Sequence, residues 1–148
     1  MFTVVKKSVE TNPRLFLEIT NLRRNISSPF ISVEKKQGYS NRAKIVVRQL
    51  NKFTEKVQSF LNSLQQGERL EICRTTSIEP IRGELVGYRR TEPYFIIKDS
   101  SGRSTYIGLN TVYSIKILST CNHCRKEFPI DGLSEGLCVK CEEDWDGI

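Results

Sequence analysis

The chain has 148 residues, enough for one ordinary domain or for two to three very small ones. Hydrophobic residues make up 38% and charged residues 27%, a globular balance, and no apolar run approaches the roughly 20 residues of a membrane-spanning helix. No apolar segment follows the two lysines near the N-terminus, so we expect no signal peptide, and we expect a reducing intracellular location such as the cytoplasm, nucleus or nucleoid.

The net charge of +6 is distributed unevenly along the chain. Residues 1–64 hold 12 Lys/Arg against 4 Asp/Glu, residues 65–120 hold 8 against 6, and residues 121–148 hold 3 against 7. The basic front favours a polyanionic partner, although a solvated surface without a partner would look the same, and the acidic end favours a different partner.

Hydrophobic patterning predicts four strands and one helix in the first part of the chain. Alternating side chains indicate strands at residues 2–9, 14–20, 29–34 and 42–48. The polar residues 37–41 (Gln-Gly-Tyr-Ser-Asn) indicate a turn. Asn51 is a candidate N-cap, the apolar stripe that follows has helical spacing, and Gly67 suits the helix end. We therefore expect a ββββα unit over residues 1–66, with one sheet face left open.

Aromatic rings and cations are predicted to share that open face. The candidate nucleic-acid-binding residues on its strands and loops are Arg14, Phe16, Arg23, Arg24, Phe30, Lys35, Lys36, Tyr39, Arg42, Lys44 and Arg48. This mixture suits single-stranded DNA or RNA, because rings stack on unpaired bases while cations follow the phosphates. Alternatively, Phe16 and Phe30 are buried in a dimer interface or against the next unit.

Residues 14–64 combine two strand motifs, a polar turn, a third strand motif and an amphipathic helix. In order, these are Arg14-Leu15-Phe16-Leu17-Glu18-Ile19, Pro29-Phe30-Ile31-Ser32-Val33, the turn with Gly38 and Asn41, Arg42-Ala43-Lys44-Ile45-Val46-Val47, and the helix. Together they resemble one repeat of the PUR family of single-stranded nucleic-acid binders. Because PUR repeats pack in pairs through their helices, the resemblance implies a homodimer, and the related whirly and coactivator-type folds imply much the same surface.

The second predicted unit, residues 68–118, is all β. Strands are expected at residues 70–75, 81–89, 94–98, 104–108 and 112–118. Five short strands suggest a small, strongly bent barrel, with Gly83 and Gly87 at positions where a strand bends and Cys73 as a buried strand residue.

The strand sequences of this second unit resemble Sm-like or SH3-like barrels. They are Gly83-Glu84-Leu85-Val86-Gly87-Tyr88, Tyr94-Phe95-Ile96-Ile97-Lys98-Asp99, Tyr106-Ile107-Gly108-Leu109 and Val112-Tyr113-Ser114-Ile115. The resemblance implies the fold only, because the RNA-contacting Sm motif is not recognisable here. A barrel that serves as a spacer or as an interaction surface is the alternative.

Four cysteines in residues 119–148 form two Cys-x2-Cys pairs: Cys121 with Cys124, and Cys138 with Cys141. Two such turns can complete a tetrahedron around one Zn²⁺, and four thiolates leave no open position, so a structural zinc is predicted. The alternatives are two disulfides or an iron–sulfur or redox role. His123 is expected to face solvent. The segment resembles zinc ribbons and zinc knuckles, which bind nucleic acid or protein.

The third unit is too short for an apolar core of its own, which is a further reason to expect a metal. Its acidic end, residues 142–146, is either a frayed tail or a docking segment for a basic protein. For the whole chain we expect a non-enzymatic protein that binds single-stranded nucleic acid. An adaptor subunit of a transcription, translation or replication complex is the second hypothesis. An enzyme is disfavoured, since the chain has one histidine and no recognisable phosphate loop or carboxylate pair.

Overall fold

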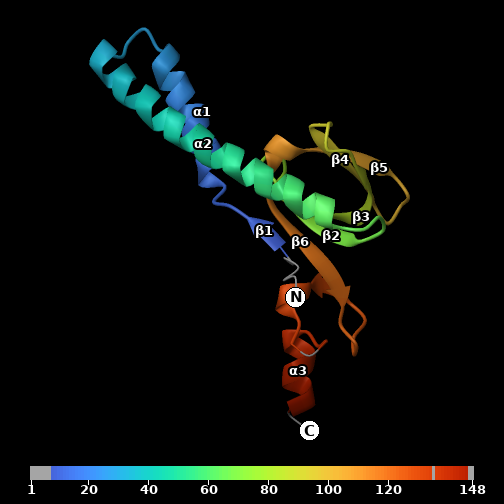
Figure 1. Ribbon diagram of the computed structural model, residues 1–148. Helices are drawn as coiled ribbons and strands as arrows, with labels where there is room; N and C mark the ends of the chain where they lie inside the picture. The colour runs from blue at the N-terminus through green and yellow to red at the C-terminus, as the bar shows by residue number, and fades with distance from the viewer. Residues whose placement is uncertain (1–7, 135, 147–148) are drawn as a thin grey trace, which may run out of the picture.

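The computed structural model describes residues 8–134 and 136–146 and has an α+β architecture (Figure 1). The helices are α1 (Arg14–Ser27), α2 (Val33–Ser63) and α3 (Val139–Asp146), with 3₁₀ turns η1 (Leu109–Thr111) and η2 (Ile130–Gly132). The strands are β1 (Ser8–Glu10), β2 (Arg69–Arg74), β3 (Ile81–Tyr88), β4 (Tyr94–Lys98), β5 (Ser104–Gly108), β6 (Val112–Thr120) and β7 (Glu127–Pro129).

The three strands predicted at residues 14–20, 29–34 and 42–48 are wrong. The first is part of α1, the second is a loop and the first turn of α2, and the third lies in the middle of α2. The polar residues 37–41 are helical as well. Residues 14–63 therefore form a helical hairpin, and the ββββα PUR-like repeat is not formed. The homodimer rested on that repeat and stays an untested prediction.

The apolar stripe of α2 explains why this region is helical. The stripe that was recognised from Phe53 onward continues toward the N-terminus through Leu50, Val46, Ala43 and Tyr39, always at intervals of three or four residues. These side chains meet those of α1, and Ile19, Leu22 and Val46 are buried between the two helices. The alternating residues of 42–48 only partly coincide with this stripe, because Ala43 and Val47 pack against the cluster while Ile45 is 45% exposed.

Polar residues at the helix ends reinforce this assignment. Ser32 caps α2 by accepting a hydrogen bond from the Lys35 backbone N–H at 3.4 Å, and Glu34 lies in the first turn. Pro13 precedes α1, where its fixed φ suits a helix start, and the Asn12 side chain accepts from the Arg14 N–H at 3.0 Å. Gly38, like Gln37 and Asn41, lies at an exposed position of this long helix.

The strands predicted over residues 68–118 are confirmed, with ends that shift by two residues at most. They form an antiparallel sheet of order β1-β6-β2-β3-β4-β5, and β7 pairs with the far part of β6. Within the described residues no strand pairing joins β5 to β6 or to β1, so the sheet is open and the small, bent barrel predicted for residues 68–118 is not formed. Residues 2–7 of the first predicted strand lie outside the described residues.

Glycines allow the bending that the sequence indicated in β3. A side chain on Gly83 would place its Cβ 2.8 Å from the Lys98 carbonyl oxygen, so only glycine permits this approach of β3 to β4. The register of this strand pair also shifts between Leu85 and Gly87, which marks a β-bulge.

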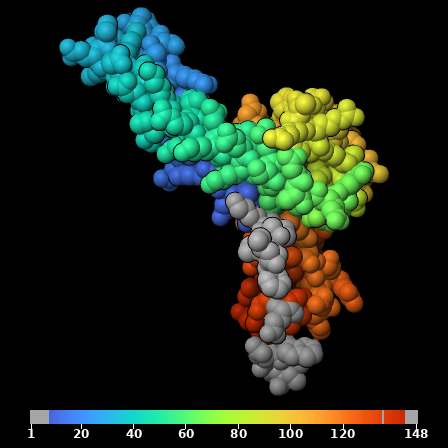
Figure 2. All heavy atoms as spheres, in the orientation of Figure 1, coloured from blue at the N-terminus to red at the C-terminus, as the bar shows by residue number. Residues whose placement is uncertain are grey.

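The main core lies between the sheet and the second half of α2. Phe53, Val57 and Phe60 of the helix pack with residues such as Leu70 and Ile115 of the sheet. The units predicted as residues 1–66 and 68–118 thus contribute to one core, and their division into separate domains stays a prediction. The first half of α2 and α1 extend beyond the sheet as an arm, while β6 leads to the cysteine module at the opposite end (Figures 1 and 2).

Candidate metal centre and basic helical hairpin

The four predicted zinc ligands come together in the structure. Cys121 and Cys124 lie in the turn after β6, and Cys138 and Cys141 lie at the start of α3. Their sulfur atoms are all within 4.8 Å of one another, and the Cys124 and Cys138 sulfurs are 3.9 Å apart. A tetrahedral Zn²⁺ with Zn–S bonds of about 2.3 Å requires sulfur separations of about 3.8 Å. The four cysteines are thus positioned to bind one metal ion.

Backbone contacts hold the two cysteine turns against each other. The Cys138 N–H donates to the Cys121 sulfur at 3.4 Å, and the Asn122 N–H donates to the Gly136 carbonyl at 2.8 Å. Gly136 has a φ of 80°, and a Cβ there would clash with the Asn122 side-chain amide nitrogen. Glycine is therefore required at this position, both for the left-handed backbone and for the close approach.

The protein environment acts in opposite directions on two of the thiols. Hydrogen bonding from the Cys138 backbone N–H lowers the pKa of Cys121 to about 5, which favours the thiolate. Burial, together with the neighbouring thiols, raises the pKa of Cys141 to about 12. A bound cation would be needed to deprotonate such a thiol at neutral pH, so metal binding should release protons.

The donor set fits Zn²⁺, and the described part of the module has only a small apolar cluster, in which Phe128, Leu133 and Leu137 pack against the cysteines. None of the five cysteines is in a disulfide, and the cluster of buried residues in the module consists of Cys121, Cys138 and Cys141 themselves. His123 is exposed, as predicted, and the metal-binding group consists of the four thiols without it. Residues 142–146 are part of α3 rather than an extended tail, and the side chains of residues 144–146 lie outside the described part.

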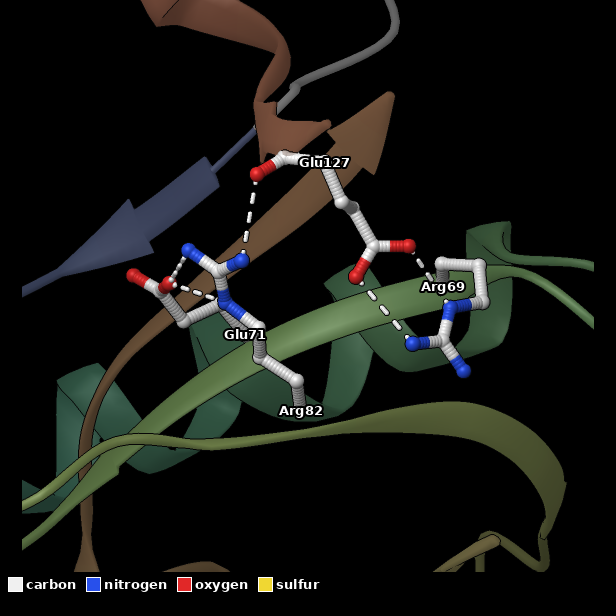
Figure 3. A network of polar contacts seen from close by, with 4 residues as sticks. All are labelled: Arg69, Glu71, Arg82 and Glu127. Atoms are coloured by element: carbon white, nitrogen blue, oxygen red, sulfur yellow. Dashed lines mark hydrogen bonds and ion pairs between the residues drawn. The ribbon is translucent and has the colours of Figure 1, made fainter. Parts of the chain in front are cut away.

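A network of charged side chains attaches the module to the sheet (Figure 3). Glu127 of β7 receives two hydrogen bonds from the Arg69 guanidinium, at 2.8 and 3.1 Å, and its carbonyl accepts from Arg82 at 3.1 Å. Arg82 in turn pairs with Glu71 at 2.8 Å. Hydrogen bonding from Arg69 lowers the pKa of the Glu127 carboxyl. The sequence does not reveal this network, because Arg69 and Glu127 are 58 positions apart.

The helical hairpin of α1 and α2 carries a large excess of positive charge. Residues 14–63 contain ten Lys/Arg and three Asp/Glu. Arg23 of α1 and Lys44, Arg48 and Asn51 of α2 line one hollow of about 430 Å³ between the helices. In the described part of the chain, no ion pair involves Arg23, Lys44 or Arg48, so their charges are available to an anion.

The other predicted cations are distributed around this arm. Arg14 and Arg24 are exposed on α1, Lys35 is exposed near the start of α2, and Lys36 is half-buried beside it. Arg42 differs, because its guanidinium already pairs with Glu18 through bonds of 2.5 and 3.2 Å. That pairing lowers the pKa of the Glu18 carboxyl and raises the pKa of Arg42.

The predicted aromatic residues do not form a continuous surface with these cations. Phe16 is half-buried on α1, and Tyr39 packs against the buried cluster of the hairpin. Phe30 is 95% exposed in the loop between the helices. The aromatic and basic sheet face expected from the sequence is therefore absent, since these residues lie on helices and a loop.

Comparisons with known proteins do not assign this chain to a family. No protein-family model matches the chain, and no curated protein and no solved structure is significantly similar to it. Among the described residues, no helix combines the length and apolar character needed to cross a bilayer. The function is therefore inferred from the cysteine cluster and the charged surfaces.

Proposed function

We propose that this chain is a non-enzymatic nucleic-acid-binding protein that contacts the phosphates of single-stranded DNA or RNA with the α1–α2 hairpin. The observation that carries the proposal is the hollow where Arg23, Lys44 and Arg48 converge without an internal carboxylate partner. Cations from two helices at one hollow form a site of the size and charge that a backbone phosphate requires.

The shape of the arm supports this proposal. Helix α1 and the first half of α2 stand away from the sheet, so a long polymer can reach them (Figure 2). Its charge excess would attract a polyanion and release counterions on binding, which makes affinity depend steeply on salt. The cysteine module lies at the other end and is acidic, so it would remain outside the contact.

We further propose that the four-cysteine module holds a structural Zn²⁺. All four coordination positions would be filled by protein thiolates, which leaves no site for substrate or water. Its role would be to fold residues that lack an apolar core, and this role requires the reduced thiols of an intracellular compartment.

The test of the phosphate site is a salt titration with two triple variants. Arg23→Ala/Lys44→Ala/Arg48→Ala removes the three cations at the hollow, and Arg103→Ala/Lys126→Ala/Lys140→Ala removes three exposed cations outside the hairpin. Binding of a labelled single-stranded oligonucleotide is measured from low to moderate salt. We expect the first variant to bind about 10-fold more weakly or worse and to lower the log–log salt slope by about 2, at roughly 0.7 per phosphate contact.

The matched variant separates a site from general attraction. Both variants have the same net charge, so equal losses would show that the hollow is not the contact surface. Absence of any oligonucleotide binding by the wild-type protein would refute the proposed function itself.

One observation favours a second function, that of an adaptor. A hollow of about 650 Å³ lies beside the cysteines and is lined by residues that include Phe128, Val139 and Lys140. Val139 is 63% exposed and so presents an apolar side chain at this hollow. As an adaptor subunit of a transcription, translation or replication complex, the chain would use this module to dock another protein. The purified chain alone would then not change the gel mobility of single-stranded DNA or RNA.

A further inference from the structure

A further hollow, separate from those at the hairpin and at the cysteines, lies on the face of the sheet that points away from the core. It has a volume of about 440 Å³, and its lining includes Gly87, Tyr94, Ile96 and Tyr106. These residues come from three neighbouring strands, β3, β4 and β5. The alternate residues Phe95, Ile97 and Ile107 point the other way and are fully buried.

Strand register explains why this hollow forms. Ile96 is the direct partner of Tyr106 on one side and of Gly87 on the other. Gly87 follows the bulge in β3, and a Cβ there would have no atom within 4 Å. The missing side chain leaves open space beside Ile96, bordered by the two tyrosines.

The two tyrosine rings hold each other in place. Their centroids are 5.3 Å apart and their planes are inclined by 67°, an edge-to-face arrangement. Tyr106 is nevertheless 64% exposed, so much of its ring faces solvent while the contact with Tyr94 restricts its orientation. A ring that is already ordered loses little side-chain entropy when a flat ligand stacks on it.

Two polar side chains of opposite charge border the same hollow. Arg89 and Glu92 line it from the β3–β4 connection. The Glu92 N–H donates to the Arg89 carbonyl at 2.9 Å, which closes a turn and keeps both residues close to the tyrosines. The hollow therefore combines a flat apolar wall with a hydrogen-bond donor and an acceptor.

We propose that this hollow binds an unpaired nucleobase of a single-stranded nucleic acid, with the base stacked on Tyr106. A nucleobase has a flat π face and an edge of donors and acceptors, which match the tyrosine ring and the Arg89 and Glu92 pair. The proposal rests on the proposed function, because the cations of the hairpin supply the attraction for the phosphates. It adds a reason for selecting single strands, since a base inside a duplex cannot present its face.

The experiment compares two oligonucleotides of equal length, one with normal bases and one with abasic sugars at the same backbone charge. For the wild-type chain we expect the normal strand to bind more tightly, by about 5-fold to about 150-fold for one stacked base. Tyr106→Ala should abolish this preference and leave binding of the abasic strand unchanged, whereas Tyr106→Phe should retain the preference.

A second variant leaves every aromatic ring in place. Gly87→Leu should fill the open space beside Ile96 and also remove the preference, and its new side chain has room because a Cβ at Gly87 meets no atom. Ile78→Ala, at a fully exposed position in the β2–β3 connection, is the matched control and should leave the preference intact.

The possible outcomes separate the two proposals. Equal binding of normal and abasic strands by the wild-type chain would overturn the nucleobase site and leave the phosphate contact standing. The site is also refuted if Tyr106→Ala retains the preference, or if it weakens both strands equally. Failure of the wild-type chain to bind either strand would refute the proposed function and the nucleobase site with it.

Discussion

The helical hairpin and the cysteine module are the two ends of this molecule, and neither has a core large enough to fold by itself. The hairpin is basic and buries a cluster of Ile19, Leu22 and Val46. The module is acidic, and its buried cluster consists of three of its four cysteines. The hairpin is therefore stabilised by helix packing, whereas the module has four thiols positioned to bind a metal ion, which we propose stabilises it.

Their attachment to the central sheet also differs. The hairpin is continuous with the main core, because the same helix α2 contributes Val46 to the hairpin and Val57 to the sheet. The module is joined through β6, which continues into the β6–β7 pairing, and through the Glu127 network. This contrast implies that loss of metal should affect one end of the molecule far more than the other.

Removal of the metal should give the largest change. A chelator such as EDTA should unfold the module, because structural zinc contributes about 10–16 kcal/mol of apparent binding free energy in small zinc-dependent folds. Hydrogen exchange followed by mass spectrometry should show loss of protection in β7 and α3, with protection retained in the second half of α2.

Cys138→Ser is the matched variant, since it removes one buried ligand and should reproduce the exchange pattern of the chelated protein without any chelator. Titration of released zinc should give one ion per chain in the wild type. Simultaneous loss of protection in α1, α2 and β7 would contradict the expectation that metal loss affects the module far more than the hairpin. It would show that the three regions unfold as one unit.

Truncation inside the hairpin core should have the next largest effect. Leu22 is 8% exposed and packs between α1 and α2, so Leu22→Ala should destabilise the hairpin by about 2 to 5 kcal/mol. The measurement is urea unfolding followed by far-ultraviolet circular dichroism, together with hydrogen exchange in α1. Protection of the cysteine module should not change.

Leu17→Ala removes the same atoms from the same helix at a position that is 67% exposed. It should therefore change the unfolding midpoint little. Equal effects of the two substitutions would show that α1 does not pack on α2 in solution as the structure has it.

The same contrast explains which parts of the fold could be predicted from the sequence. The cysteine spacing is specific because only a few ligand types and spacings suit a tetrahedral metal, and the four residues Cys121, Cys124, Cys138 and Cys141 do come together. The strands of residues 69–120 were recognisable because glycines and polar turns separate short apolar runs.

Strands were predicted in the hairpin because a short stretch of its sequence fits both the two-residue period of a strand and the 3.6-residue period of a helix. In residues 42–48 the pattern of Ala43, Ile45 and Val47 alternates, yet Ala43, Val46 and Val47 belong to the longer helical stripe. Gly38 and Asn41 favour a turn by residue type, although an exposed helix position tolerates them at a modest cost. A window of about 25 residues, from Tyr39 to Leu64, would have shown the seven-residue repeat.

The candidate sites, like the hairpin, could be predicted only in part from local sequence patterns. The basic residues of the arm could be named from the sequence, but the convergence of Arg23 with Lys44 and Arg48 depends on how two helices pack. The Tyr94–Tyr106 pair and the contact of Arg69 with Glu127 depend on strand register. Such long-range placement is set by the tertiary fold, and no local pattern encodes it.

The smallest expected effect concerns the two bidentate Arg–Glu pairs, one at each end of the molecule. Arg69 lowers the pKa of Glu127 below its ordinary value of 4.5, and this pair is partly buried, with 33% and 24% of the two side chains exposed. Glu127→Gln should cost about 1 to 2 kcal/mol at neutral pH, because a charge-assisted hydrogen bond is lost. The measurement is the free energy of unfolding from urea titrations across pH.

The pH dependence has a defined sign. A carboxyl whose pKa is lower in the folded state stabilises the protein above its unfolded pKa, and this contribution disappears as pH falls through the folded value. The difference between wild type and Glu127→Gln should therefore be constant near neutrality and should shrink below about pH 4.5. A difference that stayed constant into the acid range would show that the carboxylate charge of Glu127 contributes nothing at the junction.

Glu18→Gln is the matched control in the hairpin, where the partner Arg42 is also bound bidentately but the pair is more exposed, with 47% of the Arg42 and 33% of the Glu18 side chain accessible to solvent. Solvent screening should make its effect on stability smaller than that of Glu127→Gln at every pH. It removes one negative charge and frees Arg42 in the arm that we propose contacts phosphates, so it should tighten binding of a single-stranded oligonucleotide slightly, most at low salt. Unchanged binding by this variant at low salt would place the nucleic-acid surface away from the Glu18 side of the hairpin.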